Sequence, residues 1–491
     1  MQLVAYGAQD VYLTANPQVT FFKQLYRRHS NFAMESIEQT FNGQGNFGKR
    51  VQCTISRNGD LITKVYVQVT LPAIDSNIVV GDSVVQWVPY LGQYLIDNVV
   101  VEIGGQQIDK QYGEWLHIWN ELTLPTGKTE AYLNMVNGYA GLPVIVAPDV
   151  TCSPCATLDG SFQQQLNNLT TSEWNVDLGL YKNKALLEVF GGFGPMAAPR
   201  AKPAVAPRVP GQQQLPVLPY LFGCAPEKTL YIPLEFWFNR HTGLALPLIA
   251  LQYHEVKINV DFANLNKLVN IYGGSDADNL RTFNNLSNAG MVACSLYVDY
   301  IYLDTEERRR FAQVAHEYLI EQLQFTGTES VTSTSNKLQL RFNHPCKELV
   351  WVVQNPFFTD CNTPNKIPSL YTDLALENPV AVAKVQLNGQ DRFSEREGEY
   401  FNYVQPYQHH TSTPAKGINV YSFALRPEDL QPSGSCNFSR IDNAVLNLTL
   451  TPATFPPADF ETSNSVNVNV YATNYNVLRI MSGMGGLAYS N

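Results

Sequence analysis

Two motifs carry residues that could do chemistry, and each lacks a feature that its chemistry requires. Gly43-Gln-Gly-Asn-Phe-Gly48 matches G-x-G-x-x-G, which in dinucleotide sites opens a helix whose N-terminus meets the pyrophosphate. The residues that follow it, Val51-Gln-Cys-Thr-Ile55, alternate as in a strand, so we expect a glycine-rich loop. Cys152-Ser-Pro-Cys155 has redox or zinc spacing, but no second C-x-x-C and no H-x-H completes a tetrahedral site.

Histidines and glutamates in the last quarter suggest a metal site with the wrong spacing. His409-His410 follows an acidic run at positions 395–399, whereas double-stranded β-helix metalloenzymes use H-x-H followed by Glu. His254-Glu255 and His316-Glu317 begin H-E-x-x-H, but isoleucine occupies the last position of both. We therefore expect polar loops and interfaces here, and neither a catalytic residue nor a metal or cofactor.

Two basic clusters are candidates for contact with an anionic partner. Lys23, Arg27, Arg28 and His29 lie near the N-terminus, and Arg308-Arg-Arg310 lies near the middle. The partner would be nucleic acid, a membrane surface or an acidic protein; the alternative is a solvated helix face. A net charge of −10 argues against a protein that coats nucleic acid generally.

The cysteines, the sequons and the N-terminal residues indicate the cellular compartment in which the protein is made. The N-terminal residues do not resemble a secretory signal, and no apolar stretch approaches the roughly eighteen residues of a membrane span. We expect the eight cysteines to be free and mostly buried in a reducing compartment. The N-x-Ser/Thr sequons at Asn168, Asn285, Asn437 and Asn447 are formal glycosylation acceptors that we expect to be chance matches in an asparagine-rich chain.

The elements that must position these residues are mostly strands. Apolar residues alternate with polar ones at 65–69, 446–450 and 466–470, as in half-buried strands. Two helices are predicted. One follows the cap Asn16-Pro17, with Phe21, Phe22, Leu25 and Tyr26 on one face; the other begins at Asp304 and includes Phe311, Val314, Ala315 and Tyr318.

The chain also repeats itself at the length of a domain. Val101-Glu-Ile-Gly-Gly-Gln-Gln recurs as Val385-Gln-Leu-Asn-Gly-Gln-Asp, at an offset of 284 in the numbering. Gly113-Glu-Trp-Leu recurs as Gly398-Glu-Tyr-Phe, and Lys64 to Val69 aligns with Leu349 to Gln354, both at an offset of 285. Such self-similarity predicts two copies of one fold.

The first copy is longer than the second. Around Ile258 and Leu446 the offset drops to 188, so about 97 extra residues lie between Asn120 and Leu251. They include the proline-rich run 195–219, which is unsuited to regular structure. The chain then divides into an N-terminal arm and helix at 1–30, a first half at 31–303 with a long insertion at about 121–250, a connecting helix and linker at 304–325, and a second half at 326–491.

Several long segments resemble the major capsid proteins of nucleocytoplasmic large DNA viruses. They begin at Leu3, Asn16, Tyr26, Leu95, Leu303 and Ser482, from Leu3-Val-Ala-Tyr-Gly-Ala-Gln-Asp to Ser482-Gly-Met-Gly-Gly-Leu-Ala-Tyr-Ser-Asn491. The resemblance implies an all-β fold of two tandem eight-stranded jelly rolls, a double jelly roll, with a short N-terminal helix and a connecting helix.

The same resemblance implies a structural subunit of an icosahedral capsid. Three chains would form a pseudo-hexagonal capsomer, made in the host cytoplasm where virus assembles and located in the virion. The arm with Lys23, Arg27, Arg28 and His29 would lie at the base, against minor capsid proteins or the internal viral membrane, without sequence-specific nucleic acid. The insertion would form surface towers or clasps.

Two other classes of protein stay open from the residues alone. A carbohydrate-binding or carbohydrate-processing β-sandwich needs converging aromatic rings and, for hydrolysis, a carboxylate pair. A metalloenzyme built from two cupin-like halves needs ligand histidines in each half.

Overall fold

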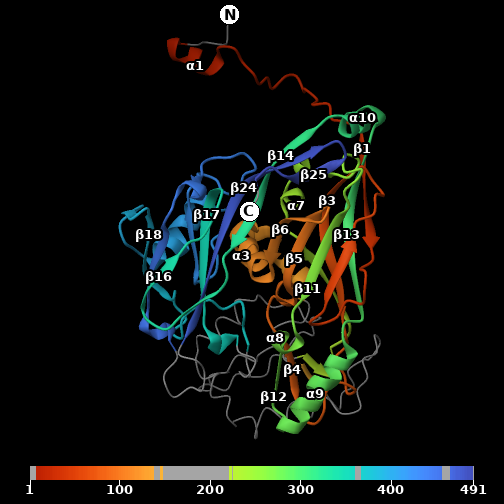
Figure 1. Ribbon diagram of the computed structural model, residues 1–491, viewed down its shortest axis with the longest axis vertical. Coiled ribbons are helices and arrows are strands. Elements are labelled where there is room, and N and C mark those ends of the chain that lie inside the picture. Colours follow the sequence, from red (N-terminus) through yellow and green to blue (C-terminus); the bar gives the residue numbers. More distant parts are fainter. Residues whose placement is uncertain are drawn as a thin grey trace, which may run out of the picture.

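The computed structural model describes residues 7–137, 144–146, 221–223, 225–359, 366–455 and 465–489. Within them the chain forms two β-sandwiches side by side, with α3 (Gly113–Thr123) between them (Figure 1). The Cys152-Ser-Pro-Cys155 motif, Asn168 and the proline-rich run 195–219 lie outside the described residues.

The first sandwich has two antiparallel sheets, of five and four strands. One contains, in spatial order, β1 (Phe32–Gln39), β13 (Ala293–Leu303) and β3 (Leu61–Leu71), with β9 (Lys228–Pro233) and β10 (Leu246–Pro247) both pairing with β3. The other contains β2 (Arg50–Thr54), β11 (Val256–Phe262), β5 (Ile96–Ile103) and β6 (Gln106–Tyr112).

The second sandwich repeats this strand order. One sheet contains β14 (His316–Phe325), β24 (Val466–Met481), β17 (Pro345–Gln354) and β21 (Ile418–Ser422). The other contains β16 (Ser335–Gln339), β23 (Ala444–Leu450), β18 (Val380–Leu387) and β19 (Gln390–Asp391). Each half packs two antiparallel sheets, and each sheet is built on a path of four strands with these crossovers. This arrangement makes a jelly roll, so the predicted double jelly roll is confirmed, and the halves are called the first and second roll.

Smaller elements decorate the rolls. An additional sheet joins β12 (Val269–Tyr272), β4 (Val84–Trp87), β7 (Val144–Val146) and β8 (Leu221–Gly223) at the end of the long axis opposite the N-terminus (Figure 1). The short strands are β15 (Glu329–Val331), β20 (Arg396–Glu397), β22 (Cys436–Asn437) and β25 (Met484–Leu487). The other α-helices among the described residues are α1 (Val11–Thr14), α2 (Leu91–Leu95), α4 (Thr129–Val136), α7 (Trp237–Arg240), α8 (Leu265–Leu268), α9 (Asp276–Ala289), α10 (Thr305–Gln313) and α11 (Gln405–His409).

The sequence repeat is real, but one of its alignments is wrong by a single position. Val65, Val67 and Val69 of β3 face the core of the first roll. The residues of β17 that face the core of the second roll are Leu349, Trp351 and Val353, at an offset of 284. The predicted offset of 285 paired residues on opposite faces, because a one-residue slip in a strand exchanges its two faces.

The two repeated glycines begin equivalent helical segments. A Cβ on Gly113 would lie 2.1 Å from the carbonyl oxygen of Ile96, and one on Gly398 would lie 1.9 Å from that of Val380. Ile96 and Val380 are themselves related by the offset of 284. Each helical segment therefore starts pressed against the backbone at the same place in its roll, where only glycine fits.

The two predicted helices fared differently. α10 begins at its Asp304 cap, whose Oδ1 accepts the Thr305 N–H at 2.7 Å, but it ends at Gln313, and Tyr318 lies in β14. The helix predicted after Pro17 was wrong. The short N-terminal helix is α1, and the apolar side chains after it, such as Phe22 at 98% exposure, contact no surface that would stabilise a helix.

The predicted segment limits also differ from the strand positions. β9 lies inside the expected insertion at 121–250 yet pairs with β3 in the first roll. β14 lies inside the expected linker yet pairs with β24 along its whole length. Both strands alternate only partly in polarity, which explains why the sequence did not reveal them. In the described part of the chain, no helix combines the length and apolarity that crossing a membrane requires.

Candidate interaction surfaces

The contact between α3 and the second roll, called the seam below, is the largest feature that the sequence did not predict. Trp115, Ile118, Trp119 and Leu122 of α3 pack on one face of the β14-β24-β17-β21 sheet. That face, called the covered face, presents Val350, Val352, Ile418, Val420 and Tyr471. Because its other face lines the core of the second roll, β17 is buried from Cys346 to Val353.

Aromatic and polar contacts fix the position of α3 on this sheet. The rings of Trp115 and Tyr471 lie 5.4 Å apart, and Phe325 stacks on Tyr471 at 4.7 Å. Glu114 accepts hydrogen bonds from the Tyr471 hydroxyl and from Asn469 Nδ2, the latter at 2.7 Å. Burial raises the pKa of Glu114 despite these donors. The seam therefore combines apolar burial with a directional anchor at the start of α3.

A chain of buried charges crosses the seam. Lys347 of β17 is fully buried, and its Nζ lies 2.6 Å from Glu321 Oε1 of β14. The other oxygen of Glu321 lies 2.8 Å from Nη1 of Arg240, which belongs to α7 of the first roll. The Arg240 guanidinium lies 3.9 Å from the ring centroid of Trp119. Burial lowers the pKa of Lys347, whereas Glu321 and Glu348 oppose that shift.

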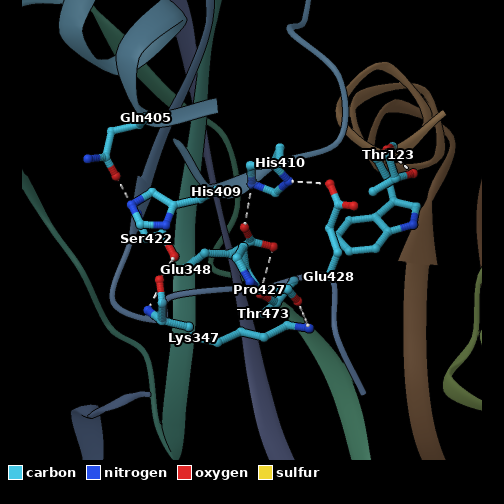
Figure 2. Close-up of polar contacts among 12 residues, drawn as sticks. Thr123, Lys347, Glu348, Gln405, His409, His410, Ser422, Pro427, Glu428 and Thr473 are labelled. Carbon is cyan, nitrogen blue, oxygen red and sulfur yellow. Dashed lines mark hydrogen bonds and ion pairs between the residues drawn. The ribbon is translucent and has the colours of Figure 1, made fainter. Parts of the chain in front are cut away.

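His410 forms a second buried ion pair in the same region (Figure 2). Its Nε2 lies 3.0 Å from Glu348 Oε2 and its Nδ1 lies 2.8 Å from Glu428 Oε1, with the imidazole fully buried. Burial alone would lower the pKa of His410, but the two carboxylates outweigh it and raise that pKa to about 9. The pKa of Glu348 is lowered by the facing imidazolium in spite of its own burial.

The sequence suggested that His410 lies in a polar loop, but its imidazole is buried between two carboxylates. The acidic run 395–399 does not contact His410 through any described ion pair. One signal was present in the sequence: Lys347-Glu348 interrupts an otherwise apolar strand. Charged side chains at such a position need buried partners. The partners were not predictable because they come from loops and strands distant in sequence.

The basic N-terminal cluster lies away from both rolls. Residues from 7 to 31 are almost all exposed and project from one end of the molecule (Figure 1). Lys23, Arg27, Arg28 and His29 lie on this segment, called the arm, and only His29 has a described hydrogen bond, to the Ser30 carbonyl at 2.7 Å. The arm also exposes Tyr12, Phe21 and Phe22 at 92, 92 and 98%.

The second basic cluster is divided between two roles. Arg308 Nε lies 3.1 Å from Asp60 Oδ1, which joins α10 to the first roll. Arg309 and Arg310 are exposed and make no ion pair among the described residues. The cluster therefore contributes one structural contact and two solvated charges.

The sequons and cysteines occupy ordinary structural positions. Asn285 Nδ2 donates to the carbonyl of Ile78 at 3.1 Å, Asn437 is exposed and caps a turn, and Asn447 is half-buried in β23. Cys53, Cys294, Cys346 and Cys436 are free, as predicted, but only Cys53 and Cys346 are buried, so the described thiols are not mostly buried. Burial raises the pKa of Cys53 to about 11. No three His, Cys, Asp or Glu residues in the described ranges are arranged to hold a metal ion.

Two matched jelly rolls side by side define a double jelly-roll protein, and solved structures similar to this chain share that fold. The PBCV-1 virus capsid has a TM-score of 0.65 at 35% identity, covering 96% of this chain and 100% of that one. The Faustovirus major capsid protein has a TM-score of 0.64 at 13% identity, covering 97% of this chain and 94% of that one, which supports the fold alone.

Sequence relatives narrow the class to a family. Residues 307–486 match the large eukaryotic DNA virus major capsid protein family, and residues 20–190 and 220–304 match the major capsid protein N-terminus. The major capsid proteins of Phaeocystis pouchetii virus and Paramecium bursaria Chlorella virus 1 are 46% and 40% identical, each aligned over 100% of this chain and 99% of the relative. The chain belongs to the major capsid proteins of large DNA viruses, and it is a structural subunit of the virion capsid.

Proposed function

We propose that three copies of this chain form a pseudo-hexagonal capsomer that tiles an icosahedral shell. The observation that carries the proposal is the match of the two rolls, strand by strand, standing side by side. Three chains then supply six similar units, and a head-to-tail contact that closes makes a ring. We assign the described residues to a first roll at 31–303 and a second roll from 326 onward, with β14 added to the second.

The proposed role is architectural, without catalysis or a cofactor. A jelly roll keeps most strand edges paired, which suits a protein made in many copies. The alternative of a carbohydrate-binding or carbohydrate-processing protein has no described feature in its favour. We propose assembly in the host cytoplasm, which agrees with free thiols at Cys53 and Cys346.

The native mass tests the capsomer. Light scattering after size exclusion is expected to give about three times the 54.9 kDa chain mass. A stable monomer at assembly concentrations would contradict the trimer.

The arm is proposed as the contact with the layer beneath the shell. It combines Lys23, Arg27, Arg28 and His29 with exposed aromatic rings, and it buries neither in the rolls. A segment of this composition gains stability only by ordering on a partner. We propose an acidic minor capsid protein, with the internal membrane surface as the other candidate.

Deletion of the residues before Phe32 tests this placement. Trimers are expected to form unchanged, whereas shells are expected to be lost under conditions where the full chain assembles. Loss of the trimer itself would place the arm between subunits instead.

A further inference from the structure

The helix and the sheet face that form the seam each have a counterpart in the other roll, but these two counterparts do not contact each other within the chain. Inside one chain, a helix of the first roll covers a sheet of the second. The counterpart helix belongs to the second roll, and the counterpart sheet belongs to the first, where nothing in the described chain covers it. The uncovered helix of one copy could therefore pack on the uncovered sheet face of a second copy.

The counterpart of α3 is the helical segment 400–409, which consists of the π-helical turn Tyr400–Val404 and α11. Gly113 and Gly398 set the correspondence at an offset of 285. Leu116 then matches Phe401, and both are buried in the core of their own roll. The seam residues Ile118, Trp119 and Leu122 match Tyr403, Val404 and Tyr407, which form the outward side of the second helical segment.

These three outward residues are exposed although they are large and apolar or aromatic. Tyr403 is 38% exposed, Val404 40% and Tyr407 83%, whereas Ile118, Trp119 and Leu122 are 0, 4 and 0% exposed. The buried residues Leu116 and Phe401 thus have the same role, and these three outward pairs differ in that one set has a partner. Tyr400, the counterpart of Trp115, is half-buried against its own roll.

The counterpart of the covered face lies on β13, β3 and β9. With the offset of 284, Tyr66 and Gln68 of β3 match Val350 and Val352 of β17. Tyr297 pairs with Tyr66 as Tyr471 pairs with Val350. Tyr231 pairs with Gln68 as Ile418 pairs with Val352. The resulting set, called the open face, is Tyr66, Gln68, Tyr231 and Tyr297.

The open face consists mainly of tyrosines, a composition suited to a surface that is exposed to solvent in the single chain and buried in an interface between chains. Tyr66 stacks on Tyr297 at 5.3 Å and contacts Tyr231 edge-on at 6.1 Å. A hollow of about 360 Å³ lies beside these rings, with Lys64 and Asp299 in its lining. Tyrosine supplies a rigid apolar ring with a polar end, which favours interfaces between separately soluble surfaces. The covered face has Val350, Val352 and Ile418 at three of the matched positions and a tyrosine, Tyr471, at the fourth.

We propose that the helical segment 400–409 of one copy docks on the open face of a second copy, repeating the seam between chains. Tyr403, Val404 and Tyr407 would cover Tyr66, Tyr231 and Tyr297. Glu399, the exposed counterpart of Glu114, would accept from the Tyr297 hydroxyl as Glu114 accepts from Tyr471. In the single chain that hydroxyl donates to Glu38 at 3.3 Å, a bond that docking would exchange. This inference rests on the proposed trimer and specifies which surfaces close it.

The test combines charge insertion with site-specific cross-linking of the full chain. The double variant Tyr403→Asp, Tyr407→Asp places two carboxylates in the proposed interface, and Leu280→Asp on α9, at 61% exposure, is the matched control. The double variant is expected to be monomeric by light scattering and to melt like the monomer of the parent chain. The control is expected to remain trimeric.

The second measurement does not depend on disrupting assembly. A photoreactive benzoylphenylalanine at position 407 is expected to cross-link to peptides of β3, β9 or β13 from a differently isotope-labelled copy. Trimers of the double variant, or cross-links elsewhere, would overturn the docking while leaving the capsomer intact. A parent chain that never trimerises would instead overturn the proposed capsomer and, with it, this interface.

Discussion

The covered face of the second roll and the open face of the first have the same strand order and different surroundings. In β17 every residue from Cys346 to Val353 is buried, whereas in β3 buried residues alternate with exposed or half-exposed ones from Thr63 to Leu71. The difference arises from α3, which covers one face and not the other. The side chains on each face match its surroundings in the single chain, mostly aliphatic under α3 and mostly tyrosine where the sheet is half-exposed.

The comparison also separates what stabilises the chain from what joins chains. The seam buries whole aromatic and aliphatic side chains, each of which contributes about 1.5–3 kcal/mol. Its counterpart residues remain in water in the single chain, so they contribute little to folding. Mutations in the seam should therefore change the free energy of unfolding, whereas mutations at the matched positions should change association between chains.

The largest expected effect comes from matched alanine substitutions on the two helical segments. Leu122→Ala empties a fully buried site in the seam and should lower the free energy of unfolding by about 2–5 kcal/mol. Tyr407→Ala, at the counterpart position with 83% exposure, should change it by less than about 0.5 kcal/mol. Chemical denaturation under conditions that keep the chain monomeric measures both.

Equal losses in the two variants would contradict the comparison. They would mean that residue 407 is already buried in the single chain. Normal secondary structure by circular dichroism is the control that makes either value interpretable.

A second difference is that the covered face contains titrating charges. Glu348 is fully buried against His410, whereas its counterpart on the open face, Lys64, is exposed. The pKa of His410 rises from 6.5 when unfolded to about 9 when folded, so folding binds a proton between these values. Its stabilisation is complete below pH 6.5 and is lost as pH rises through about 9, a decrease of up to about 3 kcal/mol.

The pH dependence is best measured as a difference from a variant. His410→Gln removes this titration and should flatten the decrease between pH 6.5 and 9. The same change removes the imidazolium that lowers the pKa of Glu348, so the difference between the two proteins reports the His410–Glu348 pair as a unit. His409→Gln is the control, because the described hydrogen bond of His409 is with the Leu425 carbonyl and not with a carboxylate. Parallel pH profiles for the parent and His410→Gln would show that folding does not raise the pKa of His410.

The contrast between the two faces also explains what the sequence could predict. Alternating valines at 65–69, the repeated glycines and the acidic cap at Asp304 depend on local chemistry, so the strands, the repeat and the start of α10 were predictable. Long family-like segments predicted the double jelly roll and the capsid role. The seam was not predictable, because the sequence around Trp115 and Trp119 is equally compatible with burial in the core of the first roll and with contact to the second.

The errors have a related cause. Phe21 and Phe22 have helical spacing, but spacing predicts a helix only where a surface accepts its apolar face, and none does in the single chain. The one-residue slip between β3 and β17 came from matching residue types across strands of different burial. Tyr66 resembles Trp351 in type, yet the first faces outward and the second faces the core.

The smallest expected effect concerns the arginine that joins the rolls. Arg240 stacks on Trp119 and pairs with Glu321, and its side chain is 19% exposed. Arg240→Lys keeps the charge but loses the planar stack, so the free energy of unfolding should fall by about 1 kcal/mol. Arg426→Lys, whose side chain is 77% exposed beside Asp429, should leave it unchanged within about 0.5 kcal/mol. If both substitutions prove neutral in denaturation measurements, the seam is stabilised by its apolar contacts alone, and the buried charges serve to align the two rolls.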